Sequence, residues 1–151
     1  MGTMRFNHME LTFPLGTLTQ EFRDDVDSFY CGVLGWNALD TMVINQSCHL
    51  LQPDDGQFIL LAEGKKPLES PGYDHLGLLM DTREEVDAVL AGCQEFQQRD
   101  DRMQLKVYED LAGPTIVVHA FYVKYLLPIW FDVQCMEYPQ GPRPGPRWQF
   151  A

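Results

Sequence analysis

Three side chains of types that bind divalent metals lie in the predicted strands, and two of them, both histidines, occupy matching positions. His8 and His75 each lie near the start of a strand, and Asp132 lies in the strand nearest the end of the chain. Side chains alternate between the two faces of a strand, so all three point away from the apolar faces that pack on helices. Two imidazoles and one carboxylate form the facial triad that holds Fe(II) and leaves positions open for substrate. These residues predict a metal site, with Fe(II) or Mn(II) favoured; ordinary strand histidines are the alternative.

Five further residues are candidates for the same site. Glu10 shares a face with His8 and could act as a general base, replace a ligand, or pair with a Lys or Arg on the next strand. His119 is a candidate proton donor or acceptor, or a structural residue of its strand. Phe58, Tyr73 and Trp130 could form an aromatic wall for a flat apolar substrate, or belong to the core. His49 has no supporting partner in the sequence.

An internal repeat indicates how the chain positions these residues. Three pairs of segments match: NHMELTF (7–13) with DHLGLLM (74–80), DDVDSFYCGV (24–33) with EEVDAVLAGC (84–93), and GQFILLAE (56–63) with PIWFDVQC (128–135). Each half is strand–helix–strand–strand–strand, in modules at about 5–63 and 73–137. The prediction is an α+β fold, with two βαβββ modules forming a curved mixed sheet around a cleft and the helices outside. The match also aligns Asp132 with the apolar Leu60.

Local signals set the expected elements. Thr17 or Thr19 caps the first helix, Gly35 ends it, and Thr82 with Glu85 forms a capping box for the second. The expected strands are 5–13, 38–45, 47–52, 57–63, 73–80, 105–110, 115–124 and 129–137, with a turn at 111–114. The domain covers 1–138. The Pro/Gly-rich tail, 139–151, either frays or places Trp148 and Phe150 on a partner subunit.

Composition limits the function classes. The chain has 151 residues and a net charge of −11, which disfavours nucleic-acid and membrane binding because both surfaces are acidic. No segment has the roughly 18 apolar residues that span a bilayer, and no secretory signal is expected. The four cysteines form no CxxC pair, and we expect reduced thiols in the cytoplasm.

Residues 5–138 resemble the vicinal oxygen chelate superfamily, which includes glyoxalase I, bleomycin-resistance and fosfomycin-resistance proteins, methylmalonyl-CoA epimerase and extradiol dioxygenases. The resemblance is carried by NHMEL, YDHLGLLMDTREEVDAVLAG and WFDVQ. Members pair βαβββ modules; the first strand of each supplies a His and the last strand of the second a Glu. The resemblance therefore implies that His8 and His75 are ligands and that Asp132 stands in place of that Glu.

The sequence departs from the family pattern in three ways. Asp132 is one methylene shorter than Glu, the segment Tyr125-Leu126-Leu127-Pro128 replaces the usual turn, and Leu60 stands where some branches have a fourth ligand. The pattern favours three-ligand branches, such as the dioxygenase-like and fosfomycin-type ones.

The resemblance implies a metal-dependent dioxygenase, lyase or isomerase whose small organic substrate chelates the metal through oxygens. The alternative is a metal-free protein that binds an antibiotic or natural product. Family members often form homodimers, and we expect one here.

Overall fold

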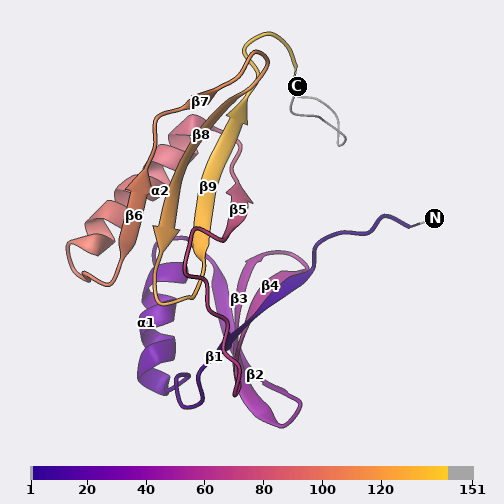
Figure 1. The fold of residues 1–151 in the computed structure, drawn as a ribbon, viewed down its shortest axis with the longest axis vertical. Helices are drawn as coiled ribbons and strands as arrows, with labels where there is room; N and C mark the ends of the chain where they lie inside the picture. The colour runs from indigo at the N-terminus through magenta and orange to yellow at the C-terminus, as the bar shows by residue number, and fades with distance from the viewer. Residues whose placement is uncertain (1, 143–151) are drawn as a thin grey trace. The chain divides into compact units, whose positions relative to one another are not determined.

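The computed structural model describes residues 2–142, which divide into two compact units. The first unit is the chain up to Ser70 with Leu126–Pro128, and the second is Pro71–Tyr125 with the chain from Ile129 onward. Each unit contains one helix and its own mixed sheet (Figure 1). The predicted tail contacts of Trp148 and Phe150 lie outside the described residues.

The first unit follows the predicted strand–helix–strand–strand–strand order. Its elements are β1 (His8–Phe13), α1 (Gln20–Tyr30), β2 (Asn37–Val43), β3 (Gln46–Asp54) and β4 (Gln57–Glu63). The sheet order is β1-β4-β3-β2, in which β1 pairs with β4 in parallel and the other pairs are antiparallel.

The second unit repeats this order with one extra short strand. Its elements are β5 (His75–Leu79), α2 (Arg83–Gln97), β6 (Gln104–Val107), β7 (Leu111–Ala112), β8 (Val117–Lys124) and β9 (Trp130–Glu137). The sheet order is β5-β9-β8-β6, with β7 paired to β8. The turn predicted at 111–114 is therefore wrong in part, because Leu111 and Ala112 pair with Val118 and Val117. The turn follows them, where the Gly113 N–H donates to the Ile116 carbonyl.

Side-chain caps begin both helices. The Thr19 hydroxyl accepts a hydrogen bond from Phe22 N–H at 3.2 Å, which selects Thr19 over Thr17 as the cap. Thr82 accepts from Glu85 N–H at 3.2 Å, and the Glu85 carboxylate accepts from Thr82 N–H at 3.0 Å. The predicted capping box is confirmed, and it satisfies donors that the first helical turn leaves unpaired.

Each sheet has one face that packs against its own helix. In the first unit this face carries Leu11, Phe13 and Leu61, and Phe13 makes an edge contact with Phe22 of α1. In the second unit the corresponding buried residues are Phe121, Phe131, Val133 and Cys135 on the sheet and Val86, Cys93 and Phe96 on α2. The opposite face of each sheet, called here the helix-free face, carries the predicted site residues of β1, β4, β5 and β9.

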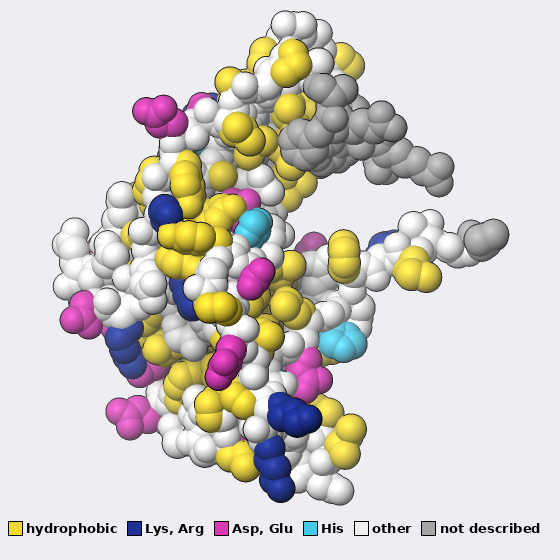
Figure 2. All heavy atoms as spheres, in the orientation of Figure 1, with side chains coloured by type: hydrophobic (Ala, Val, Ile, Leu, Met, Phe, Trp, Pro, Cys, Tyr) yellow, Lys and Arg dark blue, Asp and Glu magenta, His cyan; other side chains and the backbone are white. Residues whose placement is uncertain are grey.

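The acidic composition of the chain is visible on the described surface (Figure 2). Asp and Glu side chains are spread over the face drawn in Figure 2 and lie among hydrophobic and basic side chains. Within residues 2–142, no helix combines the length and apolar character needed to cross a bilayer.

The capping box gives a first prediction. Thr82→Ala removes the acceptor for Glu85 N–H, and we expect the free energy of unfolding to fall by about 1 kcal/mol. Urea unfolding followed by circular dichroism measures the change. Thr82→Ser keeps the hydroxyl and is the matched control, expected to stay close to the parent. Equal losses in both variants would contradict a capping role for the hydroxyl.

Candidate functional site

The helix-free face of the second sheet brings His75 and Asp132 together. β5 and β9 are parallel neighbours, and their register places His75 beside Trp130 and Gly77 beside Asp132. His75 Nε2 lies 3.9 Å from Asp132 Oδ2. The expectation from strand alternation that these side chains share a face is confirmed, and their role as ligands stays a prediction.

A hydrogen bond on the far side of the His75 ring determines where its proton sits. Nδ1 lies 2.7 Å from the Tyr73 carbonyl oxygen, which can only accept, so Nδ1–H is the donor. In the neutral ring, Nε2 then carries the lone pair that faces the Asp132 carboxylate. Two electron-pair donors at this separation form a place for a proton or a metal ion, and a backbone carbonyl commonly orients metal-binding histidines in this way.

The Asp132 carboxylate is buried and incompletely hydrogen-bonded. The residue is 8% exposed, and its Oδ1 has no hydrogen-bond partner within residues 2–142. Burial raises the pKa of this carboxyl, and the nearby His75 opposes that rise. An unpartnered buried carboxylate destabilises the fold, so its presence points to a bound proton, metal or ligand group at Oδ1.

Aromatic rings surround this pair. Tyr122 lies opposite Asp132 in the β8–β9 register, and its ring centroid is 4.9 Å from that of His75. The Tyr73 and Trp130 rings are 5.5 Å apart, and Lys106 Nζ lies 4.1 Å from the centre of the Tyr73 ring. Tyr73 and Trp130, two of the three residues predicted to form an aromatic wall, therefore lie near His75. Tyr122 lies with them and was not among the predicted residues.

The first unit groups the other predicted residues. The His8 ring stacks on Phe58 with centroids 4.7 Å apart and planes 3° from parallel. Glu10 is exposed and lies beside Leu60 in the β1–β4 register. His8 Nδ1 is 2.7 Å from Asn7 Oδ1, and the Asn7 amide nitrogen donates to the Gly56 carbonyl at 2.6 Å. Asn7 Oδ1 is thus the acceptor and His8 Nδ1 the donor, which leaves Nε2 of His8, like that of His75, with a lone pair.

His119 is not brought to this face. It lies beside Cys135 in the β8–β9 register, on the face covered by α2. Its Nε2 is 2.7 Å from Asp87 of α2, and its Nδ1 is 2.7 Å from Asp110. Arg83, at the start of α2, forms salt bridges with Asp110 at 2.6 Å and with Glu137 of β9 at 2.8 Å. This second-unit ion cluster links α2 to β8, to β9 and to the segment between β6 and β7.

The first unit contains the same arrangement. His49 Nε2 is 2.7 Å from Asp27 of α1, and its Nδ1 is 2.7 Å from Asp40 of β2. Arg23 of α1 bonds Asp40 at 2.5 Å and the Ser47 hydroxyl at 3.1 Å. In this first-unit ion cluster His49 does have partners, which the sequence analysis did not find.

The repeat carried a signal for both clusters. Arg23 and Arg83 stand at the same place, directly before the matched helix segments, and the matched segments include Asp27 and Asp87. His49 and His119 lie in the equivalent strands β3 and β8. Aligning the middle strands as well as the first and last would have paired the two histidines.

Comparison with known proteins identifies the fold. No protein-family model matches the sequence, and no curated protein matches it. A glyoxylase/bleomycin resistance protein/dioxygenase domain from Frankia sp. EAN1pec is 17% identical with a TM-score of 0.60, covering 93% of this chain and 96% of that one. The antibiotic binding protein TnmS3 from Streptomyces sp. CB03234 is 15% identical with a TM-score of 0.56, covering 91% and 99%.

A third similar structure contains a metal. It is a mutant of the fosfomycin resistance protein FosX from Listeria monocytogenes, complexed with Mn(II) and 1S,2S-dihydroxypropylphosphonic acid. This protein is 12% identical with a TM-score of 0.58, covering 87% of this chain and 92% of that one. The chain therefore has a glyoxalase-like fold, which confirms the predicted fold class and confirms the resemblance to vicinal oxygen chelate proteins at the level of the fold.

A metal ion requires several ligand side chains grouped closely around it. Within residues 2–142, no three His, Cys, Asp or Glu side chains are grouped closely enough to hold a metal ion. His75 and Asp132 are a pair in the second unit, and His8 lies in the first unit. The lone pair of His75 and the unpartnered Asp132 Oδ1 are donors that suit Fe(II) or Mn(II).

The second-unit ion cluster predicts a pH dependence of stability. Burial lowers the pKa of His119, but its hydrogen bonds to Asp110 and Asp87 outweigh burial and raise it above its usual value of about 6.5. The protonated ring stabilises the fold fully below pH 6.5, and this contribution is lost as pH rises through the higher folded-state pKa. As pH rises through this pKa, the parent protein should therefore lose more free energy of unfolding than His119→Gln does. Urea unfolding at a series of pH values measures the difference. Parallel curves of stability against pH for the two proteins would contradict a difference in the pKa of His119 between the folded and unfolded states.

Proposed function

We propose that the protein is a metal-dependent enzyme acting on a small organic substrate that chelates the metal through oxygen atoms. His8, His75 and Asp132 are the proposed ligands. The observation that carries the proposal is the buried Asp132 carboxylate, whose Oδ1 has no partner among residues 2–142 and whose Oδ2 lies 3.9 Å from His75 Nε2. Supporting it, both first-strand histidines donate from Nδ1 and so keep Nε2 available.

The residues around the proposed ligands have separate tasks. The Tyr73 carbonyl and the Asn7 amide hold the two imidazole rings in the tautomer that leaves Nε2 free. The rings of Tyr122 and Trp130 lie 6.5 Å apart, and Tyr122 is the β8 neighbour of Asp132, so the two rings offer an apolar surface next to the proposed ligands. When bound, a divalent metal supplies Lewis-acid chemistry to oxygens of the substrate. Glu10 is the proposed general base because it shares its strand face with His8.

A second candidate function is metal-free binding of an antibiotic or natural product. The observation that favours it is the cluster of Tyr73, Tyr122 and Trp130 beside Asp132, which offers a surface for a flat organic ring. The similar structure TnmS3 is itself described as an antibiotic binding protein. The predicted homodimer and the cytoplasmic location stay predictions under both candidates.

Metal binding distinguishes the two candidates. Protein purified without chelators should contain a divalent metal by elemental analysis, and calorimetry with MnCl₂ should show about one ion per chain. His75→Ala and Asp132→Asn should each weaken binding by at least tenfold, because each removes a donor, and His8→Ala should do the same if it completes the site.

His119→Gln is the matched control, since it alters a histidine on the helix-covered face of the same sheet. Unchanged Mn(II) affinity in folded His75→Ala and Asp132→Asn would contradict the proposed ligands. The absence of metal and of Mn(II) binding in the folded parent would reject the enzyme and leave the binding protein.

A further inference from the structure

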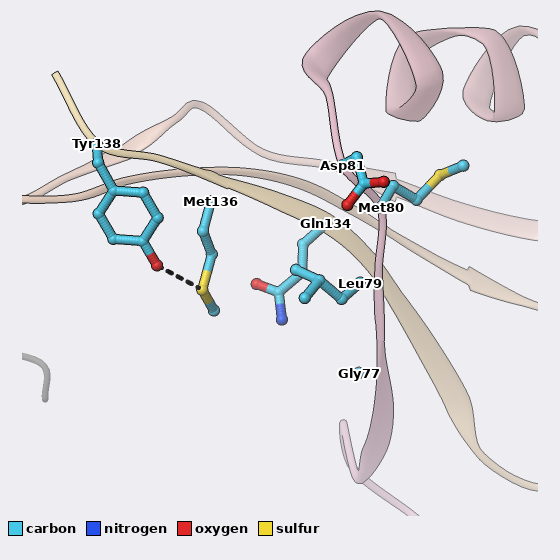
Figure 3. A pocket seen from close by; sticks show the side chains of 7 residues that line it. All are labelled: Gly77, Leu79, Met80, Asp81, Gln134, Met136 and Tyr138. Carbon is cyan, nitrogen blue, oxygen red and sulfur yellow. Dashed lines mark hydrogen bonds between the residues drawn. The ribbon is translucent and has the colours of Figure 1, made fainter. Parts of the chain in front are cut away.

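A pocket of about 300 Å³ lies within the second unit, along β5 and β9 (Figure 3). Its lining residues come from these two strands and the segments directly after them: Gly77, Leu79, Met80, Asp81, Gln134, Met136 and Tyr138. This volume is at the lower end of the range for small-molecule sites. None of the residues proposed above as ligands or general base lines it.

The pocket begins where the candidate site ends. Gly77 lines the pocket and is the β5 neighbour of Asp132, and Leu79 is the neighbour of Gln134. Asp132, Gln134 and Met136 alternate with helix-facing residues, so they lie on one face at steps of roughly 6.6 Å. A molecule bound at His75 and Asp132 can therefore continue along the same face into the pocket.

Gly77 keeps this route open. A Cβ at Gly77 would lie 3.4 Å from Gln134 Nε2, at the limit of ordinary contact, and a longer side chain would stand over the face between His75 and Leu79. No positive φ requires glycine here, so the backbone does not explain the residue. The room that the missing side chain leaves beside Gln134 does.

The pocket walls define the chemistry that fits. Leu79 and the two methionines are apolar, and the Tyr138 hydroxyl donates to Met136 Sδ at 3.9 Å, so it is used within the wall. The Gln134 side chain projects into the pocket between Met136 and Leu79 (Figure 3) and makes no hydrogen bond within the described part of the chain. The lining contains no Lys, Arg or His, and Asp81 adds a negative charge. An anionic group would therefore be disfavoured.

We infer that the substrate is elongated: an oxygen-bearing head at His75 and Asp132, and a neutral or cationic, mainly apolar arm that passes Gly77 and occupies this pocket. Gln134 supplies one hydrogen bond to a polar atom along the arm. This inference rests on the proposed function for the head, and on the pocket alone for the arm. It assigns substrate specificity to Gly77, Gln134 and Met136.

Straight-chain hydroxamic acids, from acetohydroxamic to octanohydroxamic acid, test the inference because they share a two-oxygen head and differ only in arm length. In calorimetry with Mn(II)-loaded protein, affinity should rise about fourfold per methylene until the pocket is full. Gly77→Val should abolish this dependence, so that octanohydroxamic acid binds the variant no more tightly than acetohydroxamic acid does. An arm that ends in a carboxylate should bind at least tenfold more weakly than the methyl-ended arm of equal length, and an amine-ended arm should not.

A metal-free measurement tests the arm pocket independently. N-Phenyl-1-naphthylamine, a neutral apolar fluorophore, should bind to metal-free protein, and Met136→Ala should weaken binding severalfold because it removes a wall. Met42→Ala is the matched control, since Met42 is an exposed methionine of the first unit, 66% accessible. Dye affinity that is unchanged in Met136→Ala would overturn the pocket assignment.

The two measurements separate the two claims. Hydroxamic acids that bind equally well at every arm length would overturn the elongated substrate and leave the metal site intact. Failure of every hydroxamic acid to bind, with dye binding still sensitive to Met136, would overturn the proposed function and support an apolar pocket in a metal-free binding protein.

Discussion

In each unit the first strand pairs in parallel with the last, and the rest of the unit depends on that pairing. Parallel neighbours cannot be joined by a hairpin, so the helix and the middle strands, two in the first unit and three in the second, form the crossover between them. The register then decides the site: β1 sets His8 beside Phe58, and β5 sets His75 beside Trp130 and Gly77 beside Asp132. A shift by one residue would turn His75 and Asp132 toward α2.

The same backbone plan carries different chemistry in the two units. On the helix-free face of the first sheet, Cys48, Leu60 and Ala62 form a buried apolar cluster. The second sheet has Asp132 and Gln134 in place of Leu60 and Ala62, with Tyr122 opposite Asp132. Because the registers are equivalent, the difference comes from side chains alone. The second unit thus holds the polar half of the candidate site and the pocket beside it.

The two faces of the second sheet also place carboxylates in opposite electrostatic environments. On the covered face, hydrogen bonds first from Arg83 and then from His119 lower the pKa of Asp110 to about 2, so the second-unit ion cluster favours the charged carboxylate. On the helix-free face, burial raises the pKa of Asp132, which has one oxygen without a partner. A buried carboxylate with an unpaired oxygen costs stability, whereas the paired Asp110 contributes to it.

The sequence by itself determined the repeat, the order of the longer elements, the capping box at Thr82 and the shared face of His75 and Asp132, because these follow from local hydrogen bonding and from the two-residue period of a strand. It missed β7 and both ion clusters, since His49 and His119 meet their partners across elements 22 and 32 residues apart. Only the tertiary structure decided which imidazole nitrogen stays free, that Asp132 Oδ1 has no partner among the described residues, and that Gly77 opens a pocket. Those properties depend on backbone carbonyls and neighbouring strands that no spacing in the chain encodes.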